Sequence, residues 1–501
     1  MSKMATGFGF LFVLFIAVSL HAQPYSSSIK EDPPAKKSGV RIDFATGDTT
    51  FLSKLIHGDL FRSQFQTFFS RHDSTLDDIW DFPDSTDDSL LLDLKMGDFS
   101  HHKKNRNHSF LLTDPPYDRE IPHLESMPFM DFNRVNGFYL GIATPTMIDL
   151  GRHSEIGIKG GIGYGFKEKK GQSQLAGEYR IPLKSNDTSL AAEKWKPVPT
   201  IAIGAEYHNV TSTDDAWRAE RAENAAYAFF AREDFRDYYK IDGWNAYAAF
   251  RFERKSEFRV EYRSDIYYNQ PQRVLHGTWG ESKSLPSNPE ITTGRLNSWV
   301  ITAERENVQS ENIEAKNLFG DSVTYRRMTG RVYLLQTEFG KNTGAGSSYQ
   351  RYILDARNFN PVCPGISIDT RFRMESGTGD MPLQKMQYIG GPSSLPALKN
   401  KIIAGNRLVL LNTEVRLSLA SLSSIFENDG PELVILNDFG YCTRVPNGNN
   451  LLQGFGDMKF STIAYNVGIG LGHPSGIQFG VSWRTDVKET GRFFFRFQRS
   501  F

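Results

Sequence analysis

The sequence lacks several features that would place it at once. Two cysteines in 501 residues are too few for a disulfide-built scaffold. Its 58 Lys and Arg balance 58 Asp and Glu, so the basic excess of a nucleic-acid-binding protein is missing. Beyond the N-terminus no apolar run approaches the roughly 20 residues of a membrane-spanning helix, which excludes a helical membrane protein. Aromatic residues, at 13%, and the 43 glycines are by contrast abundant.

Residues 1–22 have the pattern of a signal peptide. Lys3 supplies a positive charge, residues 8–20 are apolar, and Ser-Leu-His-Ala offers a cleavage site after Ala22. A short anchor helix is the alternative, but an apolar stretch of this length is too short to span a bilayer. No cysteine follows the stretch, which argues against a lipid anchor. The pattern therefore predicts export across a membrane.

Residues 23–131 are expected to form a polar periplasmic leader, partly disordered or partly helical. An acid-rich stretch over 77–88 precedes a basic and histidine-rich stretch that begins at His101. A metal site at His101, His102 and His108 is conceivable, but the lysines and arginine between them would repel a cation. A solvated linker is favoured, and we expect no metal and no cofactor.

From residue 132 onward the pattern changes to an alternation with a period of two. In the segment 366–375 the even positions are mainly apolar, whereas four of the odd positions are charged: Asp369, Arg371, Arg373 and Glu375. Successive side chains of a strand point to opposite faces, so this strand has one apolar and one charged face. A soluble sandwich would bury the apolar face. A membrane barrel would turn it to lipid and the charges to the lumen.

The C-terminus favours the membrane barrel. Four aromatic residues lie on one face of the last expected strand: Phe493, Phe495, Phe497 and Phe501. Such a strand would be an aggregation hazard in water. It resembles the terminal signal of Gram-negative outer-membrane barrels, with Arg499 as a departure. The fold class predicted for residues 132–501 is therefore an all-β transmembrane antiparallel β-barrel.

The barrel is expected to have 16 strands, an even number that brings both ends of the wall to the periplasm. The expected strands begin near Val135, Ser154, Ser173, Pro199, Ala222, Gly243, Ser256, Asn297, Met328, Ser348, Gly365, Ala404, Glu432, Ser461, Ser475 and Gly491. Residues 253–255 and 361–364 become short periplasmic turns, and 270–293 and 378–403 become long external loops. This topology puts Cys363 and Cys442 at opposite rims, so they should not pair.

Motifs in the last third carry a more specific resemblance. The run Tyr388 to Leu398, then Gly-Asn-Arg from Gly405 and Asn-x-Glu-x-Arg from Asn412, resembles the sixth external loop and twelfth strand of the BamA-like superfamily, the bacterial surface antigen family. Leu-Asn-Asp-Phe-Gly over 436–440 resembles the motif of the next strand, and Asn-Arg-Val-x-Gly from Asn133 resembles an entry to the first. The positions that the resemblance marks for anchoring the loop in the lumen are Gly390, Gly391, Leu395, Lys399, Lys401, Gly405, Asn406, Asn412, Glu414, Arg416, Asp438 and Gly440.

One departure from the family pattern concerns the tip of this loop. In the family an arginine at the tip folds into the barrel and bonds the aspartate of the next strand. Here the tip reads Leu395-Pro396-Ala397-Leu398, without an arginine. We therefore expect Asp438 to bond Lys399 or Lys401 inside the lumen, as point charges without a bidentate fork. Glu414 and Arg416 are expected to face the lumen and pair with neighbouring strands.

The resemblance implies a protein of the Gram-negative outer membrane that assists the insertion, translocation or transfer of protein or lipid cargo. Its implied partners are outer-membrane lipid, the assembly machinery during biogenesis and the cargo, and no nucleic acid. The periplasmic POTRA modules of many members are not evident in residues 24–131. The alternative is a passive pore or structural protein with a hydrated lumen lined by Asp369, Arg371, Arg373 and Glu414. No catalytic motif stands out, and His208 and His276 are expected to be ordinary residues, so we do not expect an enzyme.

Overall fold

The computed structural model describes most of residues 129–497. The gaps are 150–154, 184–198, 254–255, 276–283, 318, 422–429, 447–449, 474–475 and 488. The predicted signal peptide, nearly all of the leader, the histidine stretch, His276 and Phe501 lie outside the described residues.

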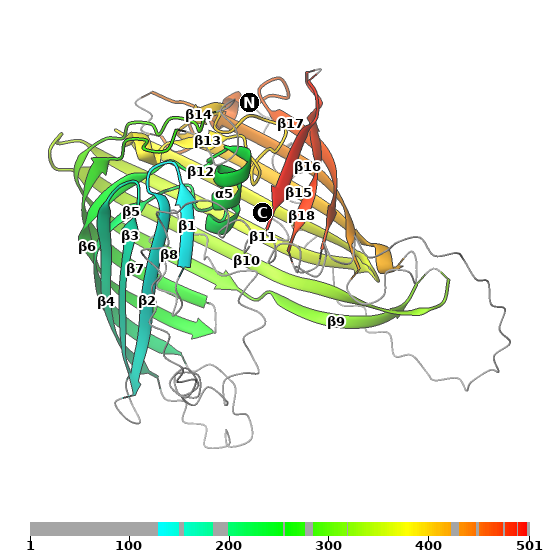
Figure 1. Ribbon diagram of the computed structural model, residues 1–501, viewed down its shortest axis with the longest axis horizontal. Coiled ribbons are helices and arrows are strands. Elements are labelled where there is room, and N and C mark those ends of the chain that lie inside the picture. Colours follow the sequence, from blue (N-terminus) through cyan, green and yellow to red (C-terminus); the bar gives the residue numbers. More distant parts are fainter. Residues whose placement is uncertain are drawn as a thin grey trace, which may run out of the picture. The chain divides into compact units, whose positions relative to one another are not determined.

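The described chain is dominated by one antiparallel sheet of 17 strands. Without β9, 16 strands pair in sequence order from β1 to β19, which is the expected number. These strands are β1 (Phe129–Asn133), β2 (Gly137–Asp149), β3 (Glu155–Gly165), β4 (Lys170–Pro182), β5 (Thr200–Ser212), β6 (Tyr239–Glu253), β7 (Ser256–Asn269), β8 (Gly294–Glu306), β10 (Ser322–Asn342), β11 (Ser348–Cys363), β12 (Ile366–Gly379), β15 (Arg407–Ser418), β16 (Glu432–Thr443), β17 (Ala464–Gly472), β18 (Gln478–Arg484) and β19 (Arg492–Arg496). Figure 1 shows the strands tilted side by side in a curved wall.

The period of two separates the faces of the wall as expected for a barrel. On β12 the charged odd positions are buried, whereas the apolar even positions are partly exposed. Large apolar side chains on the outer face are exposed. The exposed fractions of Ile162, Leu175 and Trp299 are 66%, 59% and 54%. On β12 the apolar residues therefore face outward and the charged residues inward.

Alternate connections of this up-and-down sheet lie at the same end of the wall. One end, which we call the loop end, carries the long connections β5–β6 (213–238), β7–β8 (270–293) and β12–β15 (380–406). At the opposite end, the turn end, β6 ends at Glu253 close to the start of β7 at Ser256, and a tight connection at 364–365 joins β11 to β12. Cys363 lies near the turn end and Cys442 near the loop end, and both are free, as expected.

Smaller elements occupy the connections. They are the helix α5 (Arg221–Ala226), the π-helix η4 (Tyr227–Ala231), the 3-10 helices η5 (Leu383–Lys385), η6 (Leu419–Ser421) and η7 (Phe455–Asp457), and the paired short strands β13 (Gln387–Ile389) and β14 (Ile403–Gly405). No helix among the described residues is long and apolar enough to cross a membrane.

The strand expected near Ala222 is wrong, because this segment is helical. Its alanine-rich sequence, Arg-Ala-Glu-Asn-Ala-Ala, favours a helix over a strand, and α5 continues directly into η4. The count of 16 is kept by β1, which begins at Phe129 and pairs with β2 through a three-residue turn. β1 lies before the first strand expected near Val135.

A second difference is the ribbon formed by β9 (Gln309–Lys316), which the alternation did not indicate. β9 pairs with Ser322–Thr329 of β10, whereas β8 pairs with β10 only from Val332 onward. The first part of β10 and β9 therefore extend past the turn end as a two-stranded ribbon (Figure 1).

Candidate functional site

Ion-paired side chains from β11 and β12 fill one part of the interior. Arg371 donates from Nε to Asp355 Oδ2 at 3.1 Å, and Arg373 donates from Nη1 to the same oxygen at 2.7 Å. The indole ring of Trp217, from the connection β5–β6, lies 5.1 Å from the Arg371 guanidinium carbon and 4.2 Å from that of Arg373. Buried charges are tolerated when they are paired and hydrogen-bonded. The loop tryptophan and the wall arginines therefore form one packed unit.

A second ion-paired cluster surrounds Arg416 of β15. Arg416 lies 3.2 Å from Asp369 and 2.9 Å from Glu432, on the neighbouring strands β12 and β16. Glu414 pairs with Arg416 and with Arg496 of β19. Glu414 and Arg416 thus face inward and pair across the wall.

The hydrated lumen of the passive-pore alternative is not supported at the four positions named for it. Asp369, Arg371, Arg373 and Glu414 are all 0% exposed. Opposite charges on adjacent strands pair and pack against loop residues, which leaves these groups no contact with solvent.

The connection β12–β15 folds into the barrel and packs its tip there. Leu395, Ala397 and Leu398 are buried in a cluster with Leu408 and Leu410 of β15, to which Trp217 also belongs. Burying three apolar tip residues stabilises the folded-in loop by the hydrophobic effect. The tip therefore ends in apolar contacts rather than in an inserted arginine.

The structure explains why three of the positions marked by the sequence are glycines. A Cβ on Gly440 of β16 would lie 2.5 Å from Cδ1 of Leu395, so the tip can approach the wall only over a bare backbone. Gly390 has a φ of 116°, and a Cβ there would meet the Lys399 carbonyl oxygen at 2.0 Å. Gly391 beside it also has a positive φ, of 102°.

Wall side chains anchor the tip by donating to its carbonyl oxygens. Asn412 donates from Nδ2 to the Ser394 carbonyl at 2.6 Å. Arg496 donates from Nε to the Pro392 carbonyl at 3.0 Å, and its Nη2 bonds the same oxygen. The anchoring arginine therefore belongs to the last strand and not to the loop.

The expected bond from Asp438 to a loop lysine is wrong. Asp438 accepts from Asn412 Nδ2 at 2.8 Å and from Asn466 Nδ2 at 2.9 Å, on the strands to either side of it. Lys399 is exposed, and Lys401 bonds other carboxylates. The side-chain amides of two neighbouring strands thus donate to both carboxylate oxygens of Asp438, and the loop tip supplies no cation to it.

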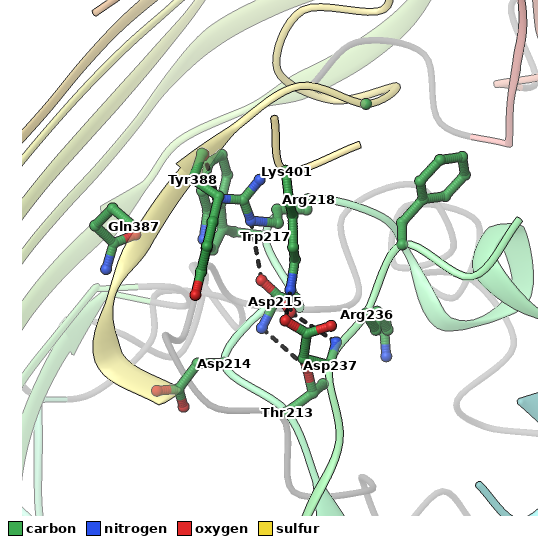
Figure 2. A network of polar contacts seen from close by, with 12 residues as sticks. Thr213, Asp214, Asp215, Trp217, Arg218, Arg236, Asp237, Gln387, Tyr388 and Lys401 are labelled. Carbon is green, nitrogen blue, oxygen red and sulfur yellow. Dashed lines mark hydrogen bonds and ion pairs between the residues drawn. The ribbon is translucent and has the colours of Figure 1, made fainter. Parts of the chain in front are cut away.

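Lys401 is the centre of the network in Figure 2, which joins two loops. Its ammonium contacts both Asp215 and Asp237, and Asp215 also lies 2.9 Å from Arg218 Nε. Burial alone would raise the pKa of Asp215, but Lys401 and Arg218 outweigh it and hold this pKa below its usual value. Asp237 continues the network to Arg134, at 2.6 Å, in the turn between β1 and β2. Connections β12–β15 and β5–β6 are thereby tied together and to the first hairpin.

The base of the loop is held by Gly405 and Asn406. Asn406 donates from Nδ2 to the Val445 carbonyl at 3.0 Å and accepts from the Val445 backbone N–H at 2.8 Å. A Cβ on Gly405 would lie 2.2 Å from the Thr443 carbonyl oxygen. These two residues join the loop to the connection β16–β17 at the loop end.

The wall has a seam between its first and last strands. Among the described residues, strand pairing ends at β1 on one side and at β19 on the other, and no ladder joins the two. Figure 1 shows α5 between them. We call Arg221–Ala231, which comprises α5 and η4, the seam helix.

The seam helix bonds the backbone edge of β19. The Tyr227 hydroxyl donates to the Phe495 carbonyl at 2.8 Å and accepts from the Phe495 N–H. The Glu223 carboxylate accepts from the Phe497 N–H at 3.1 Å. These side chains supply bonds that a neighbouring strand would otherwise supply.

On its other side the seam helix packs against the first hairpin. The rings of Phe229 and Phe132 meet edge to face with centroids 5.2 Å apart. Just after the helix, Asp234 accepts from the Arg134 N–H at 3.0 Å. One loop segment therefore contacts both strands that border the seam.

The C-terminal aromatic residues divide between the outer face and the seam. Phe493 is 67% exposed on the outer face, whereas Phe495 packs partly against Tyr227. Phe497 lies 4.8 Å from Phe495 between ring centroids. Phe494, which the alternation assigned to the other face, is buried inside.

Several central residues were not identified from the sequence: Arg134, Asp215, Trp217, Tyr227, Asp237 and Arg496. Arg134 could have been identified from the sequence, since it belongs to the Asn-Arg-Val-x-Gly segment. Arg496 could also have been identified, because the alternation of the last strand places it on the face opposite Phe493 and Phe495. The others lie in a segment expected to contain a strand, and their partners are more than 100 residues away in the sequence.

Fold and site together define a class: a large up-and-down β-barrel with an apolar exterior, a loop-filled charged interior and a seam covered by a helix. No family model and no curated protein matches the sequence. Among solved structures the chain is similar to BamA from Haemophilus ducreyi lacking POTRA domains 1-3, with 11% identity over 73% of this chain and 68% of that chain and a TM-score of 0.40. It is also similar to CdiB from Acinetobacter baumannii, with 8% identity over 73% of this chain and 57% of that chain and a TM-score of 0.32. We therefore base the proposed function on the residues of this chain.

Proposed function

We propose that this protein is an integral outer-membrane barrel of the BamA-like surface antigen superfamily that assists insertion, translocation or transfer of protein or lipid cargo. In this proposal the loop end faces outward and the turn end faces the periplasm. The partners are outer-membrane lipid, the assembly machinery during biogenesis, and the cargo. The chain acts by binding and guiding cargo and not as an enzyme.

The outer face of the wall supports the membrane location. Exposed Ile, Leu, Phe, Tyr and Trp side chains recur on successive strands, among them Ile203, Tyr207, Trp244 and Phe258. Such a continuous apolar face would drive aggregation in water, and lipid stabilises it. The charged residues that would be costly in lipid are turned inward and paired.

The observation that carries the cargo role is the seam. Strand edges with unpaired backbone groups bind other strands readily, so a protein normally covers or closes them. Within the part of the chain that the structure describes, side chains of a short helix bond the edge of β19. At the same time the interior is occupied by the tip of β12–β15 and by Trp217. The seam is therefore a better place for cargo than the lumen.

The filled interior disfavours the passive pore. A water-filled channel requires polar side chains in contact with solvent along the lumen. The wall residues expected to line it are instead dry and paired with one another.

A depletion strain tests the cargo role. We expect loss of the protein to reduce the level of outer-membrane proteins or to disturb outer-membrane lipid, and the wild-type gene to restore both. In the complemented strain, Phe497→p-benzoylphenylalanine should crosslink cargo at the seam. The control is Trp299→p-benzoylphenylalanine, on the open outer face. A strain with neither defect, or equal crosslinking at both positions, would contradict the proposal.

A further inference from the structure

A polar pocket lies near the loop end of the wall, beside outward-facing residues of β5, β6 and β7. It has a volume of about 420 Å³ and is lined by residues of β4 to β7 and of the connection that follows β7, including Lys170, Lys240 and Arg273. All of its lining residues are polar or charged. Neither the interior network nor the seam helix uses these three cations.

Strand register fixes the height of this pocket. Asn209 pairs with Asp242 and Lys240 with Tyr268, so these lining side chains form two successive rows on β5, β6 and β7. Lys240 and Asp242 share the outward face of β6 with Trp244, because they are spaced by two. The pocket thus opens outward near the loop end.

An apolar aromatic row lies directly beneath the pocket. Tyr207 and Trp244 are cross-strand partners, at 49% and 45% exposure. Tyrosine and tryptophan gather where a bilayer's hydrocarbon meets its headgroups. The pocket begins with Asn209 and Asp242 in the next row, and Lys240 follows one row further, so the pocket is at headgroup height.

The charge of the pocket is unbalanced. Its three cations face one carboxylate, Asp242, which accepts a hydrogen bond from the Tyr207 hydroxyl at 3.2 Å. Arg273 Nη1 donates to the neutral amide oxygen of Gln270 at 2.9 Å. Within the described part of the chain, neither Lys170 nor Lys240 forms an ion pair. The turn before β4 adds two further exposed lysines, Lys167 and Lys169.

We propose that this pocket binds the phosphate monoester of a membrane lipid headgroup. Lys170, Lys240 and Arg273 supply the positive charge, and Asn209 and Tyr268 supply neutral hydrogen-bonding groups. The acyl chains lie along the aromatic row below, which a free phosphate would not use. This inference rests on the proposed membrane location, and it adds a lipid of defined headgroup chemistry.

Native mass spectrometry of the purified full-length protein in detergent micelles tests the site. Phosphatidic acid, which carries a phosphate monoester, is titrated against phosphatidylcholine with the same acyl chains. The variant is Lys170→Gln with Lys240→Gln. Each lysine near an anionic headgroup contributes roughly fivefold, so we expect the double variant to bind phosphatidic acid about thirtyfold more weakly. Binding of phosphatidylcholine should be weak and unchanged.

The matched control is Lys341→Gln with Lys459→Gln. Lys341 faces outward beside the exposed Phe339 on β10 at the same end, and Lys459 is an exposed loop lysine, but neither lines this pocket. We expect the control to bind phosphatidic acid like the wild type. Equal losses in both variants, no preference for phosphatidic acid, or full displacement by an equal concentration of inorganic phosphate would overturn the inference.

Insertion into liposomes separates this inference from the proposed function. Both variants change only side chains that are exposed or, for Lys240, half-buried, so both should insert like the wild type and keep the heat-modifiable mobility of a folded barrel. A wild-type chain that fails to insert contradicts the membrane location. A chain that inserts but shows no preference for phosphatidic acid contradicts the lipid site alone.

Discussion

At the scale of single residues, the folded-in loop is held by donors of the wall and acceptors of the loop. Arg496 and Asn412 donate to carbonyl oxygens of Pro392 and Ser394. A carbonyl acceptor is available at any residue, so this arrangement leaves the side chains of the tip free for apolar packing. It also makes Arg496 a link between the last strand, the tip and Glu414 of β15.

Arg496→Ala should destabilise the barrel strongly. It removes a buried cation and leaves Glu414 with Arg416 as its remaining ion-pair partner, and breaking a buried pair costs about 3–5 kcal/mol. Denaturant unfolding of the refolded protein in micelles measures this loss. Arg492→Ala is the control, because Arg492 is one-third exposed and 3.9 Å from Glu233, so we expect a change below about 1 kcal/mol. Equal effects of the two variants would show that Arg496 is not an anchor.

The ion pairs of Asp215 predict a dependence on acid. Its pKa is lowered in the folded protein, because Lys401 and Arg218 outweigh the effect of burial. A carboxyl with a lowered pKa stabilises the fold above its unfolded pKa, and this contribution is lost as the pH falls through the folded value. The Tm difference between wild type and Asp215→Asn should therefore be largest at neutral pH and shrink once the pH falls below the usual value of 3.8.

Asp486→Asn is the control for the acid dependence. The pKa of Asp486 is also lowered, by its hydrogen bond to Arg484, but the pair is partly open to solvent, with Asp486 exposed. Exposed pairs contribute little to stability, so the Tm of Asp486→Asn should stay close to that of the wild type at each pH. An Asp215→Asn difference that is constant with pH would contradict the assigned ion pairs.

At the scale of elements, the seam helix closes the wall where strand pairing stops. Its two turns contact β19 through Tyr227 and Glu223 and the first hairpin through Phe229. A π-helix is rare, and η4 is followed directly by Arg232, which has a left-handed φ of 57°. A few side-chain bonds hold this element in place, in contrast to the eleven-residue ladders between interior strands such as β12 and β15.

Tyr227→Phe tests whether the helix protects the strand edge. The change removes the hydroxyl that both donates to and accepts from the Phe495 backbone. We expect faster hydrogen–deuterium exchange in the peptide that contains Phe495, by about five- to tenfold for the loss of roughly 1 kcal/mol. The peptide that contains β16 should be unaffected.

Tyr352→Phe is the control for this exchange experiment. The Tyr352 hydroxyl also donates a hydrogen bond, to Gln350, but on the exposed face of a strand that is paired on both sides. Exchange near β11 should stay at the wild-type rate. Unchanged exchange at Phe495 in Tyr227→Phe would mean that the seam is protected in another way.

At the scale of the whole molecule, the alternation with a period of two predicted those features of the fold that depend on neighbouring residues. It gave the inward and outward faces of β12 and the count of 16 strands, because both depend on neighbouring residues and on closing the wall. It placed a strand at Ala222, where local helix propensity decides instead. A resemblance at the motif level identified Gly440 and Asp438, but it also predicted a lysine partner that the structure replaces with amides.

The interior network of ion pairs and hydrogen bonds could not be predicted from the sequence pattern. Lys401 and Asp215 are separated by 186 residues, and Tyr227 and Phe495 by 268. No periodicity relates positions so far apart, and their contact depends on how two long loops fold into the same space. Those contacts bury the four wall residues named for a hydrated lumen, and because pattern could not predict the contacts, the passive pore stayed open as an alternative at the level of the sequence.

Single-channel conductance in planar bilayers tests the central claim most directly, namely that the interior is filled by loops and that cargo is handled at the seam. The wild-type protein should show small, flickering events, because the tip of β12–β15 and Trp217 occupy the interior. Replacing residues 392–398 with a Gly-Ser linker should increase the conductance, since the apolar tip and its bonds to Arg496 and Asn412 are lost. Large, stable openings of the wild-type protein would contradict the account and favour a passive pore.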